Sequence, residues 1–140
     1  MLKAGSVILS IEMGLQFLVS VLNHLVSLFG KYAPILKMAF TDEELSTLDA
    51  KYIATRKALA IMHNSGAVVG TFLFLVMIWT SLINGHKWAF WVLLLAGTFG
   101  HTFWFIGDRY IGNETLKVNI VLTALFLVGI SLAGYGIFKR

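Results

Sequence analysis

The sequence predicts an all-α integral membrane protein, a four-transmembrane-helix bundle with a partly helical long loop between its first two helices. Hydrophobic residues make up 58% of the 140 residues and charged residues only 13%. Four apolar segments are each about long enough to cross a hydrocarbon core of roughly 30 Å, which takes about 20 helical residues. Backbone amides in lipid must be paired within the segment, and four spans are too few for a β-barrel, so we expect helices.

The expected spans cover residues 4–30, 58–84, 88–107 and 118–138, and the whole chain, 1–140, forms a single domain. The first segment lacks a small-residue cleavage site and carries polar residues such as Glu12, so we expect a retained span and not a signal peptide.

The long loop, residues 31–57, is the one stretch with soluble character. Pro34 is expected to end or kink the first helix as it leaves the membrane. Thr41 with Glu44, and Ser46 with Asp49, have capping-box spacing. We therefore expect residues 41–63 to begin as an exposed helix that continues into the second span.

Small residues in the second span indicate how the bundle closes. Gly66 and Gly70 have the Gly-x-x-x-Gly spacing that lets two helix backbones approach closely. We expect them to serve packing, either within one chain or between subunits.

Charge and cysteine content narrow the function classes. The chain has no cysteine, which excludes disulfides, thiolate metal sites and thiol nucleophiles. The net charge of +4 sits on a chain with little soluble surface. It favours contact with anionic membrane lipids and argues against nucleic acid as a partner.

The distribution of Lys and Arg predicts the orientation. With four spans, the long loop and the turn 108–117 lie on one side, and the termini and the turn 84–87 lie on the other. The long-loop side carries seven Lys and Arg residues and the other side four. The positive-inside rule therefore predicts that the long loop and the turn 108–117 are cytoplasmic.

Histidines recur at one depth in three spans. His24 lies six residues before Gly30, His63 six after Lys57, and His101 seven before Asp108. At about 1.5 Å per residue, each lies roughly 9–10 Å below the long-loop surface.

Ionisable groups inside a membrane usually face the bundle interior or a wet cavity. The sequence therefore predicts a polar pocket in the long-loop leaflet that binds a small, partly lipophilic ligand. Its expected lining is His24, His63, Asn64, His101, Trp104 and Asn119. The alternative is that each polar residue only makes an interhelical hydrogen bond.

Glu12 lies roughly 18 Å farther from the long-loop surface than His24, so we expect it outside the histidine level. A buried carboxyl without a cation is expected to be neutral and bonded to Gln16 or to a neighbouring helix. A proton relay or a ligand contact is the alternative.

Three stretches carry a resemblance to a known family. "GTFGHTFWFIG" (97–107) resembles the third-helix segment of the MAPEG family, the membrane-associated proteins in eicosanoid and glutathione metabolism. "HNSGAVVGTFLFL" (63–75) is similar to that family's second helix, and "KMAFTDEE" (37–44) to the stretch after its first helix. The order of the three stretches agrees, and so do the chain length and the four spans.

The resemblance implies a homotrimer that binds glutathione between subunits near the cytoplasmic surface. It also implies a transferase or peroxidase acting on lipophilic substrates. Asn64, His101 and either Arg56 or Lys57 would be the glutathione contacts. The family's arginines before the Asn and its Glu three residues after it correspond here to "ALAIM" and Ala67. Its usual third-helix Tyr corresponds to Phe105, and "NETLKV" stands where the fourth helix of the family supplies Arg and Tyr.

Two further function classes remain open, and the sequence does not decide whether the chain is an enzyme. A haem could use His63 and His101 on opposite faces, and a metal site could add His24 or Asp108. No two histidines share a helix at i, i+3 or i, i+4 spacing, which argues against such a site. The other class is an accessory subunit of a larger membrane complex.

Overall fold

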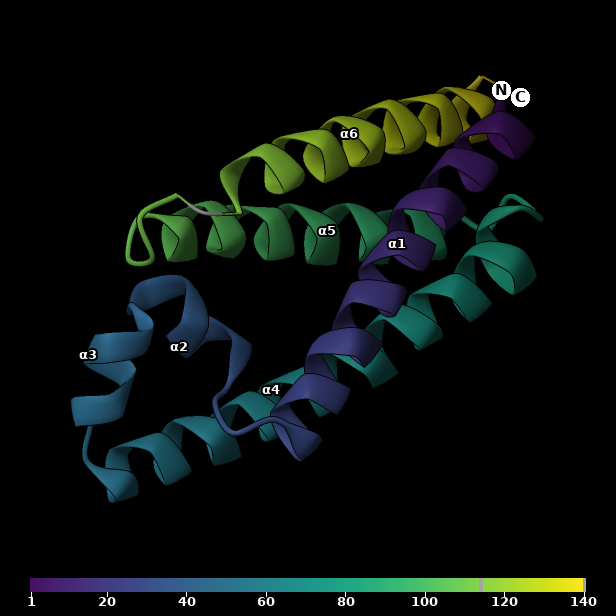
Figure 1. The fold of residues 1–140 in the computed structure, drawn as a ribbon. Coiled ribbons are helices and arrows are strands. Elements are labelled where there is room, and N and C mark those ends of the chain that lie inside the picture. The colour runs from purple at the N-terminus through teal and green to yellow at the C-terminus, as the bar shows by residue number, and fades with distance from the viewer. Residues whose placement is uncertain (114, 140) are drawn as a thin grey trace.

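The computed structural model describes residues 1–113 and 115–139, and these residues form helices and turns without a strand. The elements are α1 (Leu2–Phe29), α2 (Pro34–Ala39), α3 (Asp42–Thr47), α4 (Ala50–Met77) with a π-helical extension η1 (Ile78–Leu82), α5 (Lys87–Asp108) and α6 (Leu116–Phe138) (Figure 1). Four helices, namely α1, α4 with η1, α5 and α6, are long and apolar enough to cross a membrane. The predicted all-helical fold is confirmed, and the four apolar helices indicate a multi-pass membrane protein.

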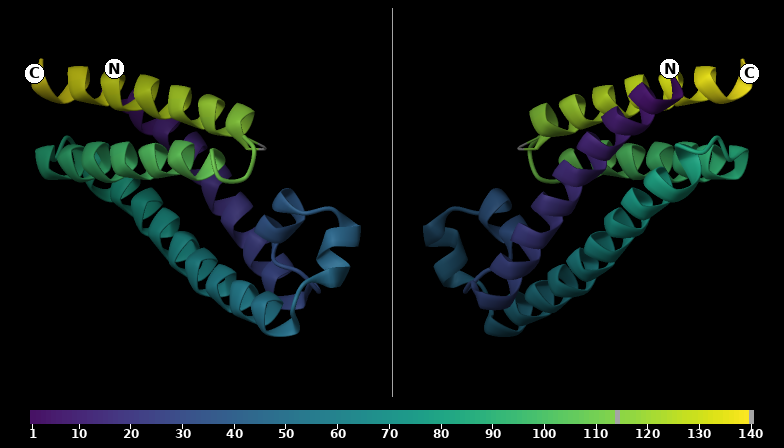
Figure 2. Two further views of the ribbon diagram at one scale, coloured as in Figure 1. Left: turned by 90° about the vertical axis from the view of Figure 1, so that its left-hand side faces the viewer. Right: turned by 90° about the vertical axis from the view of Figure 1, so that its right-hand side faces the viewer.

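The four long helices form two pairs, α1 with α4 and α5 with α6, and the pairs spread apart toward one end of the molecule. Helix α1 packs against both α4 and α6, and α5 packs against α6. Helix α4 diverges from α5 with distance from the turn that joins them, as the two views of Figure 2 show. The termini and the α4–α5 turn lie at one end of the molecule, and α2, α3 and the α5–α6 turn lie toward the other (Figure 1). This arrangement agrees with the two sides expected from the sequence.

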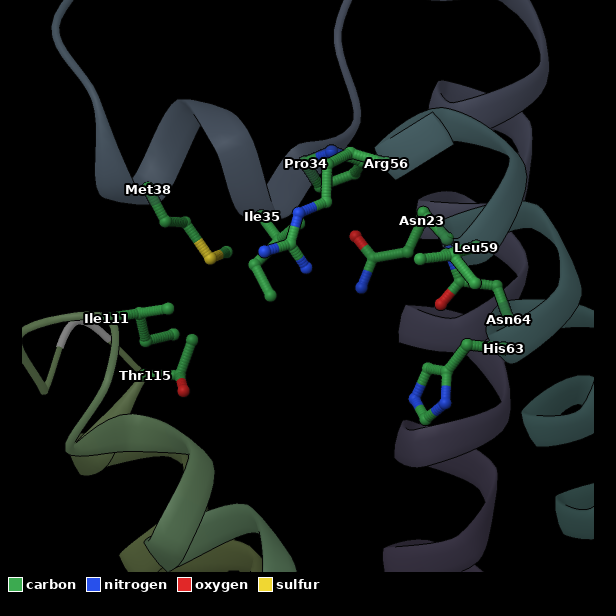
Figure 3. Close-up of a pocket in the computed structure, with 11 residues that line it drawn as sticks. Asn23, Pro34, Ile35, Met38, Arg56, Leu59, His63, Asn64, Ile111 and Thr115 are labelled. Atoms are coloured by element: carbon green, nitrogen blue, oxygen red, sulfur yellow. The ribbon is translucent and has the colours of Figure 1, made fainter. Parts of the chain in front are cut away.

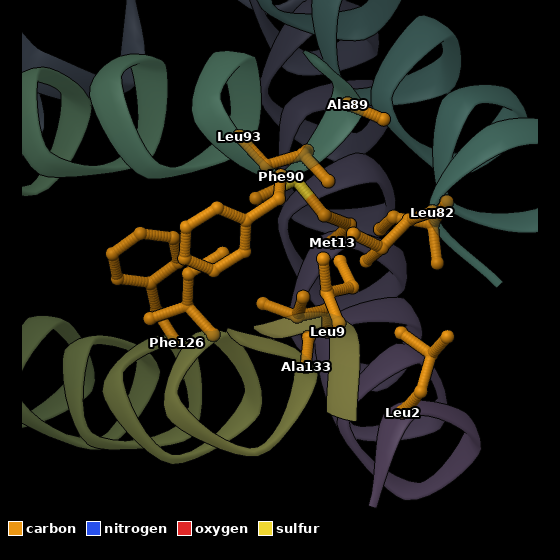
Figure 4. Close-up of a cluster of buried hydrophobic side chains, with 12 residues drawn as sticks. Leu2, Leu9, Met13, Leu82, Ala89, Phe90, Leu93, Phe126 and Ala133 are labelled. Atoms are coloured by element: carbon orange, nitrogen blue, oxygen red, sulfur yellow. The ribbon is translucent and has the colours of Figure 1, made fainter. Parts of the chain in front are cut away.

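The main hydrophobic core lies at the end of the molecule that holds the two termini, where α1 crosses α6 and η1 meets α5 (Figure 4). It consists of Leu2, Leu9, Met13, Ile78, Leu82, Ala89, Phe90, Leu93, Phe126, Ile130, Ala133 and Ile137. A smaller cluster of Ala33, Leu36 and Leu45 holds α2 and α3, with Tyr32, Phe40, Leu48 and Ala60 packed against it. The long-loop end is therefore held by fewer apolar contacts.

Glycines allow the close approach of α1 to α6. A Cβ atom at Gly5 would lie 2.4 Å from the backbone nitrogen of Ala133, and one at Gly129 would lie 2.8 Å from Cγ of Leu9. In contrast, no atom lies within 4 Å of a Cβ at Gly66 or Gly70. Packing of small residues within the chain thus uses α1 and α6, and the Gly-x-x-x-Gly pair of α4 makes no such contact in the described residues.

The long loop differs from its prediction in two respects. The expected continuous helix from residue 41 is two helices, because Leu48 is extended and Asp49 caps α4 by accepting from the backbone amides of Lys51 and Tyr52. Ser46 does not form a capping box with Asp49; it donates to the carbonyl of Glu43. The Thr41–Glu44 capping box is confirmed.

Helix α1 ends at Phe29, before Pro34 is reached, so proline neither terminates nor kinks it. Pro34 instead begins α2. This position suits proline, because the first helical residue needs no amide donor and a fixed φ favours the helix.

The Gly5 contact generates the first prediction. Gly5→Ala is expected to destabilise the protein by about 1–3 kcal/mol, because the new methyl group meets the α6 backbone and forces α1 away. Gly14→Ala is the matched control, since no atom lies within 4 Å of its Cβ position on the same helix. Thermal unfolding in one detergent checks both variants, and equal melting temperatures would contradict the close contact.

The capping box generates a pH prediction. The backbone amide and then the hydroxyl of Thr41 donate to Glu44 and hold the pKa of that carboxyl below its ordinary value. Because the folded pKa is lowered, the capping box contributes stability above the ordinary carboxyl range and loses it as pH falls through the Glu44 pKa. Thr41→Ala is expected to raise this pKa toward the ordinary value, as measured by NMR titration of the Glu44 side-chain carbonyl carbon.

Ser46→Ala is the control, because the Ser46 hydroxyl bonds only the Glu43 carbonyl. A Glu44 midpoint that stays unchanged in Thr41→Ala would show that Thr41 does not set it.

Candidate functional site

A cavity of about 360 Å³ opens between α2, α4 and the α5–α6 turn (Figure 3). We call it the loop-side pocket. Its lining is Asn23, Pro34, Ile35, Met38, Arg56, Leu59, Ala60, His63, Asn64, Ile111 and Thr115. The pocket exists because α4 diverges from α5 while the short helix α2 spans part of the space between them.

The loop-side pocket combines polar and apolar groups. Figure 3 shows the polar ends of Arg56, Asn23 and His63 around part of the space, with Met38, Ile111 and the hydroxyl of Thr115 across from them. The pocket thus offers a cluster of polar groups together with apolar surface.

Arg56 supplies the positive charge of the loop-side pocket. Its Nε donates to the hydroxyl of Tyr52 at 3.2 Å, and its guanidinium carbon lies 5.3 Å from the centre of the Tyr52 ring. Tyr52 therefore holds the side chain, while the two terminal nitrogens form no hydrogen bond with a described residue. Among the described residues, no carboxylate lies within 4.0 Å of this guanidinium.

Hydrogen bonds between α1 and α4 position polar groups of the pocket. Asn64 Nδ2 donates to Ser27 Oγ at 3.3 Å, and Ser27 Oγ donates to the carbonyl of Asn23 at 2.7 Å. Lys57 Nζ donates to the carbonyl of Gly30 at 2.8 Å, so it closes the end of α1 and does not line the pocket.

A second polar group lies where α1, α5 and α6 meet, and we call it the Glu12–His101 cluster (Glu12, Gln16, His101 and Thr123). Glu12 is fully buried and His101 is 5% exposed. His101 Nε2 lies 3.5 Å from Glu12 Oε1, and His101 Nδ1 lies 2.9 Å from Thr123 Oγ1. Gln16 Nε2 donates to Glu12 Oε1.

A cavity of about 100 Å³ adjoins this cluster. It is lined by Met13, Gln16, Thr71, Phe74, Ala96, Gly97, Gly100, His101 and Trp104. The ring of Trp104 meets the His101 ring edge to face at 5.4 Å, and Phe126 lies 4.9 Å from His101 on another side. Aromatic rings therefore enclose an imidazole whose two nitrogens face Glu12 and Thr123.

The expectation that Glu12 lies outside the histidine level is wrong for His101. The prediction counts depth below the long-loop surface along each helix separately, which holds only if the helices are parallel. In the structure α1 runs obliquely to α6 and α5 (Figure 2), and Glu12 in its first half approaches His101 of α5. The expected bond between Glu12 and Gln16 is confirmed.

Asn119 belongs to a third group, at the α5–α6 turn. Its Nδ2 donates to Asp108 Oδ2 at 2.6 Å, and the hydroxyl of Thr115 donates to the other oxygen of Asp108. Asp108 and Asn119 are both buried. These bonds hold the turn together, so Asn119 stabilises the fold and does not line either cavity.

The structure does not bring the six predicted residues into one pocket. His63 and Asn64 line the loop-side pocket, His101 and Trp104 line the smaller cavity, and Asn119 lies in the turn. His24 lines neither cavity, and its Nδ1 is buried without a hydrogen-bond partner.

Sequence reasoning missed several residues of the loop-side pocket. The predicted lining does not include Asn23, and Arg56 enters the prediction only through the family resemblance. The contributions of Met38 and Ile111 depend on how two loops fold toward each other. The one available signal was Pro34, which is a favoured helix start and could have indicated the short helix α2.

The residues described here bring no three His, Cys, Asp or Glu side chains close enough to hold a metal ion. His63 and His101 line different cavities, so they do not form the two-sided haem site considered from the sequence.

No protein-family model, curated protein or solved structure matches the chain. The resemblance to the MAPEG family is neither supported nor contradicted by these comparisons, and it stays a prediction. The two cavities are therefore the features of the molecule that indicate a function.

The turn bonds generate a stability prediction. Asp108→Ala removes the acceptor of the buried Asn119 amide and is expected to cost about 1–3 kcal/mol. Asp108→Asn keeps one acceptor oxygen and should lose less stability. Asp42→Ala, at an exposed position, should lose little stability. Thermal unfolding measures all three, and an equal loss in Asp108→Ala and Asp42→Ala would contradict the assigned role.

Proposed function

We propose that the protein binds a small amphiphile in the loop-side pocket, with the polar head of the ligand at Arg56 and its apolar part against Met38 and Ile111. The observation that carries the proposal is one cavity lined both by the guanidinium of Arg56 with further polar groups and by apolar side chains such as Met38 and Ile111. Ligand pockets span about 300–1,000 Å³, so a volume of about 360 Å³ suits a small ligand.

The charge of the pocket favours an anionic head. A guanidinium held at Nε by Tyr52 presents its remaining nitrogens in a fixed plane, which matches the two oxygens of a carboxylate. Asn23 and His63 add polar groups beside it. A fatty-acid-like ligand combines this head with an apolar chain, and it is the simplest ligand that satisfies both kinds of group.

The position of the pocket supports a ligand taken from the membrane. The pocket lies at the end of the molecule where α1 and α4 pass from apolar to charged sequence. Helix α2 carries exposed Ile35 and Met38 next to Lys37, a pattern that suits a helix lying at the lipid headgroups. The positive-inside rule places this end in the cytoplasm, so the ligand would enter from the cytoplasmic leaflet.

Glutathione is the second candidate ligand, and one observation favours it. Arg56 and Asn64, two of the contacts implied by the MAPEG resemblance, line the same pocket. His101 lines the smaller cavity, so a glutathione site in the loop-side pocket would lack that contact in a single chain. This candidate also carries the proposal of a homotrimeric enzyme.

The proposed function is tested by comparing the melting temperature in nanodiscs that contain dodecanoate or dodecanol at equal mole fraction. Dodecanoate is expected to raise the melting temperature more than dodecanol, because only dodecanoate has an anionic head for Arg56. Arg56→Gln should weaken dodecanoate binding by about tenfold or more, since hydrogen bonds to charged groups contribute about 1.5–3 kcal/mol. Lys51→Gln, on the same helix and outside the pocket, is the control.

Equal stabilisation of the wild type and Arg56→Gln by dodecanoate would contradict the proposal. Stabilisation by glutathione, and not by dodecanoate, that is lost in Arg56→Gln would establish the second candidate in its place.

A further inference from the structure

Glu12 is an isolated acid within the spans. In the described parts of α1, α4, α5 and α6, the acidic residues are Glu12 in α1 and Asp108 at the end of α5. It is fully buried. A buried carboxylate needs a compensating cation or a proton, because its transfer out of water is costly.

The groups around Glu12 leave one source of positive charge. Gln16 faces it from α1 and His101 from α5, while Thr123 of α6 contacts the far side of the imidazole. From α4, Thr71 lines the adjoining cavity. In the described chain, no Lys or Arg lies within 4.0 Å of this carboxyl, so protonated His101 is the one cation that can pair with it.

The net charge of the pair depends on the number of protons it holds. With two protons it carries +1, with one proton it is neutral, and with none it carries −1. A net charge in a buried site is unfavourable, whereas a neutral pair avoids that penalty. The one-proton state is therefore favoured, whichever of the two side chains carries the proton.

The geometry suits a proton held between the two side chains. His101 Nδ1 is engaged by Thr123 Oγ1 at 2.9 Å, which directs Nε2 toward Glu12. The distance from Nε2 to Glu12 Oε1, 3.5 Å, exceeds that of an ordinary hydrogen bond, and both Nε2 and Glu12 Oε2 are buried without a partner. A shared proton would give Nε2 a hydrogen-bond partner and would add to the one bond, from Gln16, that the carboxyl group accepts.

The adjoining cavity of about 100 Å³ leaves room for water beside the pair. Gln16, Thr71 and His101 line the cavity and contribute polar groups. A water molecule occupies about 30 Å³ in the liquid, so a few waters fit beside the pair.

We propose that Glu12 and His101 form a proton-binding site within the membrane, which holds one shared proton and couples its protonation to the packing of α1 against α5 and α6. The proposal does not depend on amphiphile binding, because the pair does not line the loop-side pocket. Gain or loss of a proton leaves a net charge between the helices and weakens their contact.

The pH dependence of the melting temperature tests the site, because the two single variants are expected to change it in opposite ways. The wild type should be most stable at intermediate pH, with flanks that approach about 4 °C per pH unit. In Glu12→Gln only the imidazole titrates, so the alkaline loss disappears and the acid loss remains. In His101→Gln only the carboxyl titrates, so the acid loss disappears and the alkaline loss remains.

Exposed titratable groups provide the controls. Glu43→Gln and His86→Gln should leave the profile unchanged, because both side chains are exposed. The double variant Glu12→Gln/His101→Gln should lose the part of both flanks that the pair contributes, and the acid loss that remains is that of other carboxyls such as Glu44. Identical profiles in the two single variants, or an unchanged profile in either, would overturn the proposal.

A measurement on the wild type avoids variants that fail to fold. NMR titration of the Glu12 side-chain carbonyl carbon and the His101 imidazole nitrogens is expected to show two steps, each reported by both residues, because interacting groups share their titration steps. Independent single steps at the two residues, or no titration of either from acid to alkaline pH, would refute a shared proton.

Discussion

The pairing of polar groups inside apolar helices is the constraint on which this structure depends. Helix formation satisfies the backbone, and hydroxyls such as those of Ser10 and Thr71 donate to carbonyls four residues earlier in their own helices. The remaining polar side chains need partners on other helices. Asn64 donates a hydrogen bond to Ser27, Asn119 donates one to Asp108, and Glu12 lies close to His101. Each of these contacts fixes how two helices lie against each other.

Packing and pairing together explain why the two ends of the molecule differ. At the end of the termini, Gly5 and Gly129 let α1 and α6 approach closely, and a large apolar core fills the junction with η1 and α5. At the other end, the helix pairs separate, and the small cluster around Leu36 and the bond from Lys57 to the Gly30 carbonyl hold the loop. The space that remains becomes the loop-side pocket. The large apolar core and the proposed binding site therefore lie at opposite ends of the molecule.

Local sequence signals predicted the helices well because they depend on near neighbours. Apolar runs identified the four long helices, and the spacing of Thr41 and Glu44 identified a true capping box. The break at Leu48 was missed because Asp49 competes with Ser46 for the role of cap, and spacing alone does not decide between them.

The site was harder to predict because it depends on helix crossing. Counting residues from the membrane surface grouped His24, His63 and His101, but the structure separates them and brings Glu12 to His101 instead. Crossing angles follow from contacts such as that of Gly5 with Ala133, which link distant parts of the chain. Four of the six predicted lining residues remain together as two pairs, His63 with Asn64 and His101 with Trp104, since each pair lies on one helix.

Photo-crosslinking with a diazirine-bearing fatty acid tests the central claim, an amphiphile in the loop-side pocket, most directly. Peptide mapping after irradiation in nanodiscs is predicted to place the label in residues 34–38 and 56–64, and excess dodecanoate should remove it. Label spread over the lipid-facing surfaces of α5 and α6, and insensitive to dodecanoate, would show that the fatty acid only dissolves in the surrounding lipid and would contradict the account.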